Sequence, residues 1–169
     1  MTRVVLSLGS NVGDRLATLR SALTALTVDG PLRPVALSPV YETAPVGGPR
    51  QPDYLNAVLV ADTDLDPVAL LALAQATEAA HGRVRPAGER WAPRPLDLDV
   101  VVYGGLRRRD PVLTLPHPRA HERAFVLVPW ADADPGAELP GHGPVGELAA
   151  RVGGQRVRRR DDLLLVAAR

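Results

Sequence analysis

Lysine is absent from this sequence of 169 residues, and all 20 basic residues are arginine. A Walker-type phosphate loop needs a lysine beside the phosphates, and Schiff-base catalysis needs a lysine amine, so both are excluded. If the protein binds phosphate groups, arginine side chains or metal ions must hold them.

Cysteine is also absent. Its absence removes disulfide bonds, thiolate catalysis and thiolate metal sites, although it does not identify a compartment. The sequence shows no signal peptide and no long apolar span, so we expect a cytoplasmic protein without a membrane segment. The net charge of +1 provides no domain-wide basic field, so we expect no nucleic-acid partner.

The composition is that of an ordinary globular domain, with 46% hydrophobic and 23% charged residues. A chain of 169 residues is long enough for a sizeable core. We find no repeat and no linker that would divide it. We therefore expect a single domain over residues 1–169, and a monomer.

Two aspartates in one short stretch are the strongest chemical signal. The residues after Pro95 are rich in β-branched and aromatic types, which predicts a strand. Because strand side chains alternate, one face carries Leu96, Leu98, Val100 and Val102, and the other carries Asp97, Asp99, Val101 and Tyr103. A rise of about 3.3 Å per residue places the Cα atoms of the two aspartates roughly 6–7 Å apart.

The simplest interpretation of this pattern is a strand face in water. Val101 and Tyr103 continue the same face, however, and both are apolar. Two neighbouring carboxylates in a partly buried place repel each other and need cations, and Arg90 and Arg94 are close in sequence. Oxygen ligands of this kind suit Mg²⁺ that arrives with substrate phosphates, as phosphoryl or nucleotidyl transfer requires.

The first half of the chain reads as alternating strands and helices. Strands are predicted over residues 3–9, 35–43 (bent near Pro39) and 54–61, and a helix follows the glycine-rich turn at residues 9–14. Asp66 and Pro67 predict the start of a second helix that ends at Gly82. Residues 44–52 form a proline-rich loop. Asn56 is either a satisfied core residue or a ligand contact.

The second half is less regular. Residues 82–93 form an arginine-bearing loop, residues 107–109 a solvated tip, and residues 112–115 a short strand. Residues 116–123 read as a turn into a short helix, and residues 125–130 are apolar and pack. A loop is predicted over residues 131–143 and a helix over 145–152. Residues 163–166 could add an edge strand, preceded by the arginine run at 158–160.

Several motifs occur together in one order. They are Leu8-Gly9-Ser10-Asn11, Tyr41-Glu42-Thr43-Ala44-Pro45, Asp53-Tyr54-Leu55-Asn56, Arg90-Trp91-Ala92-Pro93-Arg94-Pro95-Leu96-Asp97-Leu98-Asp99, Leu115-Pro116-His117-Pro118 and Glu122-Arg123-Ala124-Phe125. From about residue 4 to about residue 135 the chain closely resembles the 6-hydroxymethyl-7,8-dihydropterin pyrophosphokinase family of folate biosynthesis. The resemblance implies a ferredoxin-like α+β sandwich, with a mostly antiparallel sheet flanked by helices. It also implies transfer of pyrophosphate from ATP to the hydroxymethyl group of the pterin, with release of AMP.

The resemblance further implies roles for individual residues. Asp97 and Asp99 would bind two Mg²⁺ ions that arrive with ATP, and Arg83 and Arg94 would stabilise the charge that develops during transfer. The ATP site would be formed by Gln75, Glu78, Arg83, Arg85, Trp91, Arg94, Val100, Thr114, His117 and Arg123. The pterin pocket would be formed by Thr43, Ala44, Val46, Tyr54, Asn56, Trp91 and Phe125.

Three positions depart from the family pattern. Ala44 stands where members often have a second proline, Gly88 is an extra residue in the second loop, and Val112 stands where some members carry an arginine that contacts ATP. These departures bear on loop motion and ATP affinity more than on the reaction itself.

Two other classes were weighed. A zinc hydrolase could use His117 and His121, which lie four residues apart, but no glutamate stands in the HExxH position. A ferredoxin-like RNA-binding module would need exposed aromatic residues on its strands and a basic face. Only 4% of the residues are aromatic, which disfavours that module.

Overall fold

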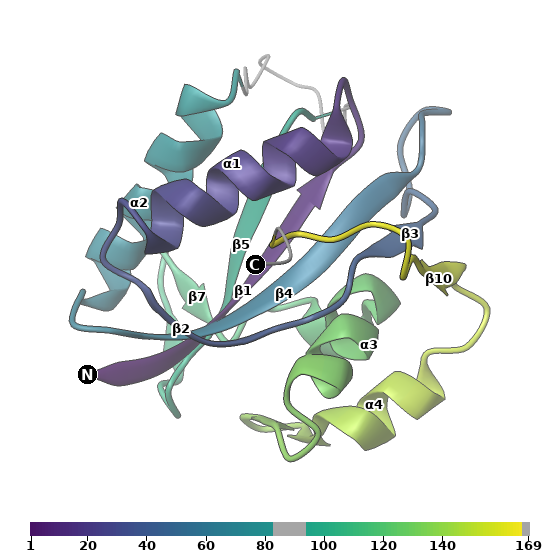
Figure 1. The fold of residues 1–169 in the computed structure, drawn as a ribbon. Coiled ribbons are helices and arrows are strands. Elements are labelled where there is room, and N and C mark those ends of the chain that lie inside the picture. Colours follow the sequence, from purple (N-terminus) through teal and green to yellow (C-terminus); the bar gives the residue numbers. More distant parts are fainter. Residues whose placement is uncertain (83–93, 167–169) are drawn as a thin grey trace.

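A computed structural model describes residues 1–82 and 94–166 of the chain (Figure 1). Its first half alternates strands and helices much as the sequence predicts. The elements are β1 (Thr2–Ser10), α1 (Arg15–Thr27), β2 (Arg33–Leu37), β3 (Tyr41–Thr43), β4 (Tyr54–Thr63), α2 (Pro67–Ala80) and β5 (Asp97–Tyr103). The predicted bend near Pro39 is confirmed, since it separates β2 from β3.

The second half consists of shorter elements. They are β6 (Arg108–Arg109), β7 (Thr114–Leu115), the 3₁₀ helix η1 (Ala120–Glu122), α3 (Ala124–Ala133), β8 (Glu138–Leu139), β9 (Gly143–Pro144), α4 (Val145–Arg151) and β10 (Val157–Arg159). Among the residues described, no helix is long and apolar enough to cross a membrane.

The central sheet has the order β10-β3-β4-β1-β5, and β2 pairs with β4 beside β3. All of its pairings are antiparallel. Helices α1 and α2 cover one face, and α3 and α4 cover the other (Figure 1). The expected ferredoxin-like α+β fold, an antiparallel sheet flanked by helices, is confirmed.

Two hydrophobic cores lie on opposite faces of the sheet. The α1/α2 core includes Leu8, Leu26 and Leu70, and the α3/α4 core includes Leu127 and Trp130, all almost fully buried. The helix starts follow from local chemistry, because Asp14 and Asp66 cap α1 and α2 through side-chain hydrogen bonds to the amides of Ala17 and Ala69. The cores leave the carboxyl end of β3 and the amino ends of β4 and β5 free to frame a site.

The strict alternation predicted for β5 is wrong beyond Val100. A β-bulge shifts the register with β1 between Val5 and Leu6, so that Val101 and Val102 both pack in the α3/α4 core. Tyr103 consequently turns to the opposite face from the aspartates, where its hydroxyl donates to the carbonyl oxygen of Leu65 at 2.7 Å.

The predictions for the C-terminal region also need correction. The edge strand is Val157–Arg159, not residues 163–166, because the arginine-bearing segment pairs with β3. Leu165 is instead buried in the α1/α2 core. Residues 131–143 contain β8 and the start of β9, and the strand predicted over residues 112–115 is only Thr114–Leu115.

Candidate active site

A cavity forms where the β3–β4 loop meets the start of β5 and the segment from His117 to Phe125. Its wall combines polar, aromatic and charged side chains from parts of the chain far apart in sequence. The lining residues are Thr43, Ala44, Pro45, Val46, Gln51, Tyr54, Asn56, Arg94, Asp97, Asp99, His117, Arg119, Arg123 and Phe125.

Asp97 and Asp99 enter the cavity together, on the β5 face predicted from alternation. Arg94 donates a hydrogen bond to Asp97 at 3.0 Å. Arg123 Nη1 lies 3.7 Å from Asp99 Oδ2, and His117 Nε2 lies 3.9 Å from Asp99 Oδ1. The carboxylates are therefore framed by two arginines and an imidazole.

Burial and the neighbouring carboxylate disfavour the charged form of Asp99. Burial, followed by the negative charge of Asp97, raises the pKa of Asp99 to about 7, although Arg123 acts in the opposite direction. Burial also lowers the pKa of His117 to about 4, and the positive charge of Arg123 adds to this effect. At neutral pH His117 is therefore uncharged and adds no positive charge next to the aspartates.

Two hydrogen bonds hold β5 in place beside the cavity. The backbone N–H of Leu98 donates to Oε1 of Glu78 at 2.8 Å, which satisfies a donor on this edge strand. The amide of His117 donates to the carbonyl oxygen of Val101 at 2.8 Å. Glu78 is 3% exposed, so this α2 carboxylate is part of the frame that positions the aspartates.

Another part of the cavity lining suits a flat heterocycle. Asn56 Nδ2 donates to Thr43 Oγ1 at 2.6 Å, and both side chains are buried while also lining the cavity. Asn56 is therefore a satisfied buried residue that also lines the cavity, and its contact with a ligand stays a prediction. Tyr54 and Phe125 supply aromatic surface, with the Arg123 guanidinium carbon 5.4 Å from the centre of the Phe125 ring.

Asn11 connects the loops on either side of the cavity. Its Oδ1 accepts from the amide of Arg94 at 2.8 Å. Its Nδ2 donates to Gln51 Oε1 at 2.9 Å and to the carbonyl oxygen of Pro52 at 3.1 Å. The sequence favours a plain turn with a helix cap at residues 9–14 over an anion site at the helix start. The structure shows that Asn11 of this turn joins the β3–β4 loop to the start of β5.

Several expected site residues lie elsewhere. Gln75 is exposed on α2, Val100 is buried in the α1/α2 core, and Thr114 lines a neighbouring hollow together with His117. The expected residues Arg83, Arg85 and Trp91, with Gly88, lie outside the described residues. Pro45, Gln51 and Arg119 line the cavity but were not singled out from the sequence, because a proline-rich loop and a mixed turn carry no spacing signal.

The zinc-hydrolase alternative is not supported by the geometry. His117 faces Asp99, whereas His121 stacks on His142 with ring centroids 4.3 Å apart. In the described part of the chain, no group of three or more His, Cys, Asp or Glu side chains could hold a metal ion by itself.

A cavity with paired carboxylates, arginines and aromatic side chains has the groups that an enzyme for phosphoryl transfer to a small-molecule substrate needs. Residues 5–135 match the family model of 7,8-dihydro-6-hydroxymethylpterin-pyrophosphokinase. The chain belongs to this family.

Curated relatives agree with the family assignment. The chain is 48% identical over 165 residues to the 2-amino-4-hydroxy-6-hydroxymethyldihydropteridine pyrophosphokinase of Mycobacterium tuberculosis H37Rv, covering 90% of this chain and 85% of the relative. It is 43% identical over 159 residues to the enzyme of the same name from Methylorubrum extorquens, covering 94% of this chain and 99% of the relative. The activity is therefore pyrophosphoryl transfer to hydroxymethyldihydropterin in folate biosynthesis.

Solved structures support the fold. A crystal structure of Plasmodium falciparum HPPK-DHPS superposes with a TM-score of 0.69 at 13% identity, covering 88% of this chain. This chain spans 45% of that longer protein, so the likeness concerns the architecture of one part of it.

Proposed function

We propose that the donor is ATP, that the product is AMP, and that Asp97 and Asp99 bind two Mg²⁺ ions that arrive with the nucleotide. The observation that carries this proposal is the pair of carboxylates that β5 directs into one cavity, beside Arg94, Arg123 and the imidazole of His117. Mg²⁺ is commonly held by one or two carboxylates with substrate phosphates and waters, so two aspartates fit it without a third protein ligand. When bound, Mg²⁺ supplies neutralisation of the phosphate charge.

The chain's own residues divide the remaining work. Arg94 and Arg123 face the carboxylates and are placed to contact phosphate oxygens, a role that the guanidinium fork suits. Arg83, Arg85 and Trp91 remain proposed ATP contacts on the resemblance alone. In the described cavity we find no strong general base other than Asp97 and Asp99, which the metal ions would occupy, so positioning and charge neutralisation would supply most of the rate.

The pterin occupies the wall formed by Thr43, Asn56, Tyr54 and Phe125. The two polar side chains offer hydrogen bonds to an amide-like ring edge, and the two aromatic rings offer flat contact. We expect the hydroxymethyl group to lie toward Asp97 and Asp99, which line the same cavity. The cytoplasmic location and the monomeric state stay predictions.

The metal assignment is tested with Asp99→Asn. We expect turnover to fall by at least about 1000-fold, because the lost carboxylate weakens a charge-stabilising interaction in the transition state. We also expect the metal-free variant to melt at least about 2 °C higher than the wild type at pH 8, since the substitution removes a desolvated charge that Asp97 repels. Thermal melts and Mn²⁺ binding in the presence of an ATP analogue measure these effects.

Asp64→Asn is the matched control, because Asp64 is exposed and pairs with the N-terminal amine and Arg33, away from the cavity. It should change neither turnover nor Mn²⁺ binding. An Asp99→Asn enzyme that retained metal-dependent turnover would remove Asp99 from the metal site.

A further inference from the structure

The C-terminal strand β10 carries a set of charges that the reaction does not explain. It lies outside the residues 5–135 that the family model matches. Its register with β3 pairs Val157 with Thr43, Arg158 with Glu42, and Arg159 with Tyr41. The segment thus forms the sheet edge next to the strand that leads into the β3–β4 loop.

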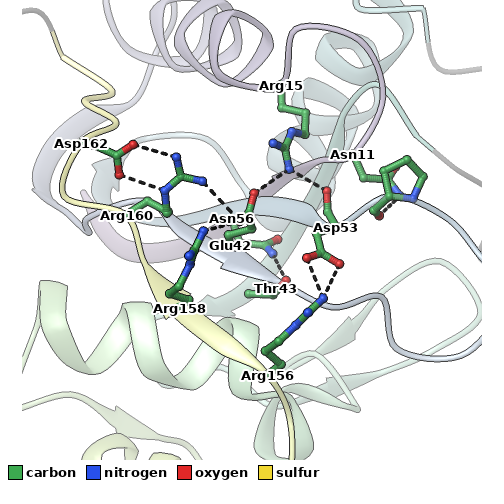
Figure 2. A network of polar contacts seen from close by, with 11 residues as sticks. Asn11, Arg15, Glu42, Thr43, Asp53, Asn56, Arg156, Arg158, Arg160 and Asp162 are labelled. Carbon is green, nitrogen blue, oxygen red and sulfur yellow. Dashed lines mark hydrogen bonds and ion pairs between the residues drawn. The ribbon is translucent and has the colours of Figure 1, made fainter.

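Alternation separates the arginines of this segment. Arg159 points to the α3 side, where it pairs with Asp132 and Asp161. Arg156, Arg158 and Arg160 point to the α1 side, as Figure 2 shows. There they form what we call the arginine network, which consists of Arg15, Arg156, Arg158 and Arg160 with Glu42, Asp53 and Asp162.

Glu42 is the centre of this network. It accepts from Arg15 at 3.1 Å, from Arg158 at 2.9 Å and from Arg160 at 3.3 Å. Burial raises the pKa of Glu42, but the hydrogen bonds from Arg15 and Arg158 outweigh it and leave the pKa below its usual value. The carboxylate is therefore charged at neutral pH, and it holds β10 and α1 against β3.

Arg156 makes the contacts closest to the loop. Its carbonyl oxygen accepts from the amide of Ala44 at 3.2 Å, at the first residue of the loop. Its Nη2 donates to both carboxylate oxygens of Asp53, at 2.7 and 2.6 Å, at the last residue of the loop. One residue thus joins both ends of the segment 44–53, and Arg15 adds a bond to the carbonyl oxygen of Asp53 at 2.9 Å.

These contacts lie directly behind the cavity. Thr43 and Ala44 at one end of the loop, and Tyr54 after the other end, line it. Arg156 does not line the cavity, so any influence on the substrate must pass through the position of these residues. The side chain is 66% exposed, and exposed ion pairs contribute little to global stability, so its removal should leave the fold intact.

We propose that Arg156 is a positioning residue that fixes the β3–β4 loop and thereby the wall that receives the dihydropterin. This inference rests on the proposed placement of the pterin against Thr43, Tyr54 and Asn56. A loop anchored at both ends keeps this wall in one conformation before the substrate binds. Without the anchor, only part of the population would present the binding-competent wall, and the apparent affinity for pterin would fall by that fraction.

The test is Arg156→Gln in the full chain. If the competent conformation falls to about one fifth, the KM for the pterin rises about fivefold, while kcat and the KM for ATP change less than about twofold. Hydrogen exchange should show faster exchange of the amides in residues 44–53. Arg156→Lys, which retains the charge, should recover part of both effects.

Arg159→Gln is the matched control, since it removes the same charge from β10, three residues further along and on the other face. It should leave the pterin KM and the exchange of residues 44–53 unchanged. Asp53→Asn breaks the same pair from its other side, and the double variant with Arg156→Gln should be no worse than either single variant. If Arg156→Gln does not fold, Asp53→Asn tests instead whether the pair between Arg156 and Asp53 positions the loop.

An unchanged pterin KM with unchanged exchange in Arg156→Gln would overturn the proposal. So would equal increases in the KM for pterin and the KM for ATP, because they would indicate general loosening. A failure of the proposed function would give a different result, because the wild type would then produce no AMP from ATP and pterin. Hydrogen exchange of residues 44–53 would still decide whether Arg156 holds the loop.

Discussion

Strand propensity and packing around the cavity predict opposite effects on stability when Gly9 is replaced with alanine. Gly9 lies on β1 between its pairing partners Asn56 on β4 and Asp97 on β5. Glycine within a strand is generally less stable than alanine by roughly 0.5–1 kcal/mol. Propensity alone therefore predicts that Gly9→Ala stabilises the protein.

The structure predicts the opposite sign. A Cβ atom at Gly9 would lie 2.7 Å from Oδ1 of Asn56 and 3.3 Å from Cδ1 of Tyr54. Asn56 is 3% exposed and bonded to Thr43 at 2.6 Å, so it cannot move away without losing that bond. Overpacking of this kind costs about 1–3 kcal/mol. At roughly 2–4 °C per kcal/mol for a chain of this size, the melting temperature should fall by about 2–12 °C.

Calorimetry measures the melting temperature, and steady-state kinetics measure the KM for the pterin. The melting temperature should fall and the KM should rise together, because Asn56 and Tyr54 line the cavity. Gly105→Ala is the control, since a Cβ there would have no heavy atom within 4 Å. A Gly9→Ala protein that melted at or above the wild-type temperature, with the same pterin KM, would refute this reasoning.

Two further predictions concern buried polar groups. Glu78→Ala should lower the free energy of unfolding by about 1–3 kcal/mol in denaturant titrations, because the amide of Leu98 loses its acceptor. Glu78→Gln should retain most of the stability, and equal losses in the two variants would contradict this role of Glu78. Burial and the hydrogen bond to Asp132 raise the pKa of Tyr41 to about 12. A folded pKa above the unfolded value of about 10 means that the stability from this phenol is fully present below pH 10 and is lost between pH 10 and 12. Tyr41→Phe should remove that loss in unfolding measured against pH, and a wild type without any decline in this range would contradict the assignment.

Much of the fold could be predicted because the sequence carries strong local signals. Asp66 and Pro67 start α2 as expected, and the apolar runs give β1, β4 and β5. The bulge in β5 could not be foreseen, because it arises from pairing with β1 and not from the composition of β5. The edge strand was misplaced for a similar reason: ion pairs with Glu42 favour the arginine segment over the more apolar residues 163–166.

The candidate site was predictable where spacing or residue type limits the chemistry. The two aspartates on one strand face follow from alternation alone. The structural role of Glu78, in contrast, depends on the distance between α2 and an edge strand, which no sequence pattern specifies. The hydrogen bonds of Asn11 to Gln51 and of Arg156 to Asp53 join residues 40 and 103 positions apart, so no sequence pattern indicates them.

Nucleotide product analysis tests the central claim most directly. The protein is mixed with Mg²⁺, ATP and 6-hydroxymethyl-7,8-dihydropterin, and the nucleotides are separated. We predict AMP that forms only when both pterin and Mg²⁺ are present, and none with Asp99→Asn. Release of ADP, or AMP formed without Mg²⁺, would contradict pyrophosphoryl transfer at the paired aspartates.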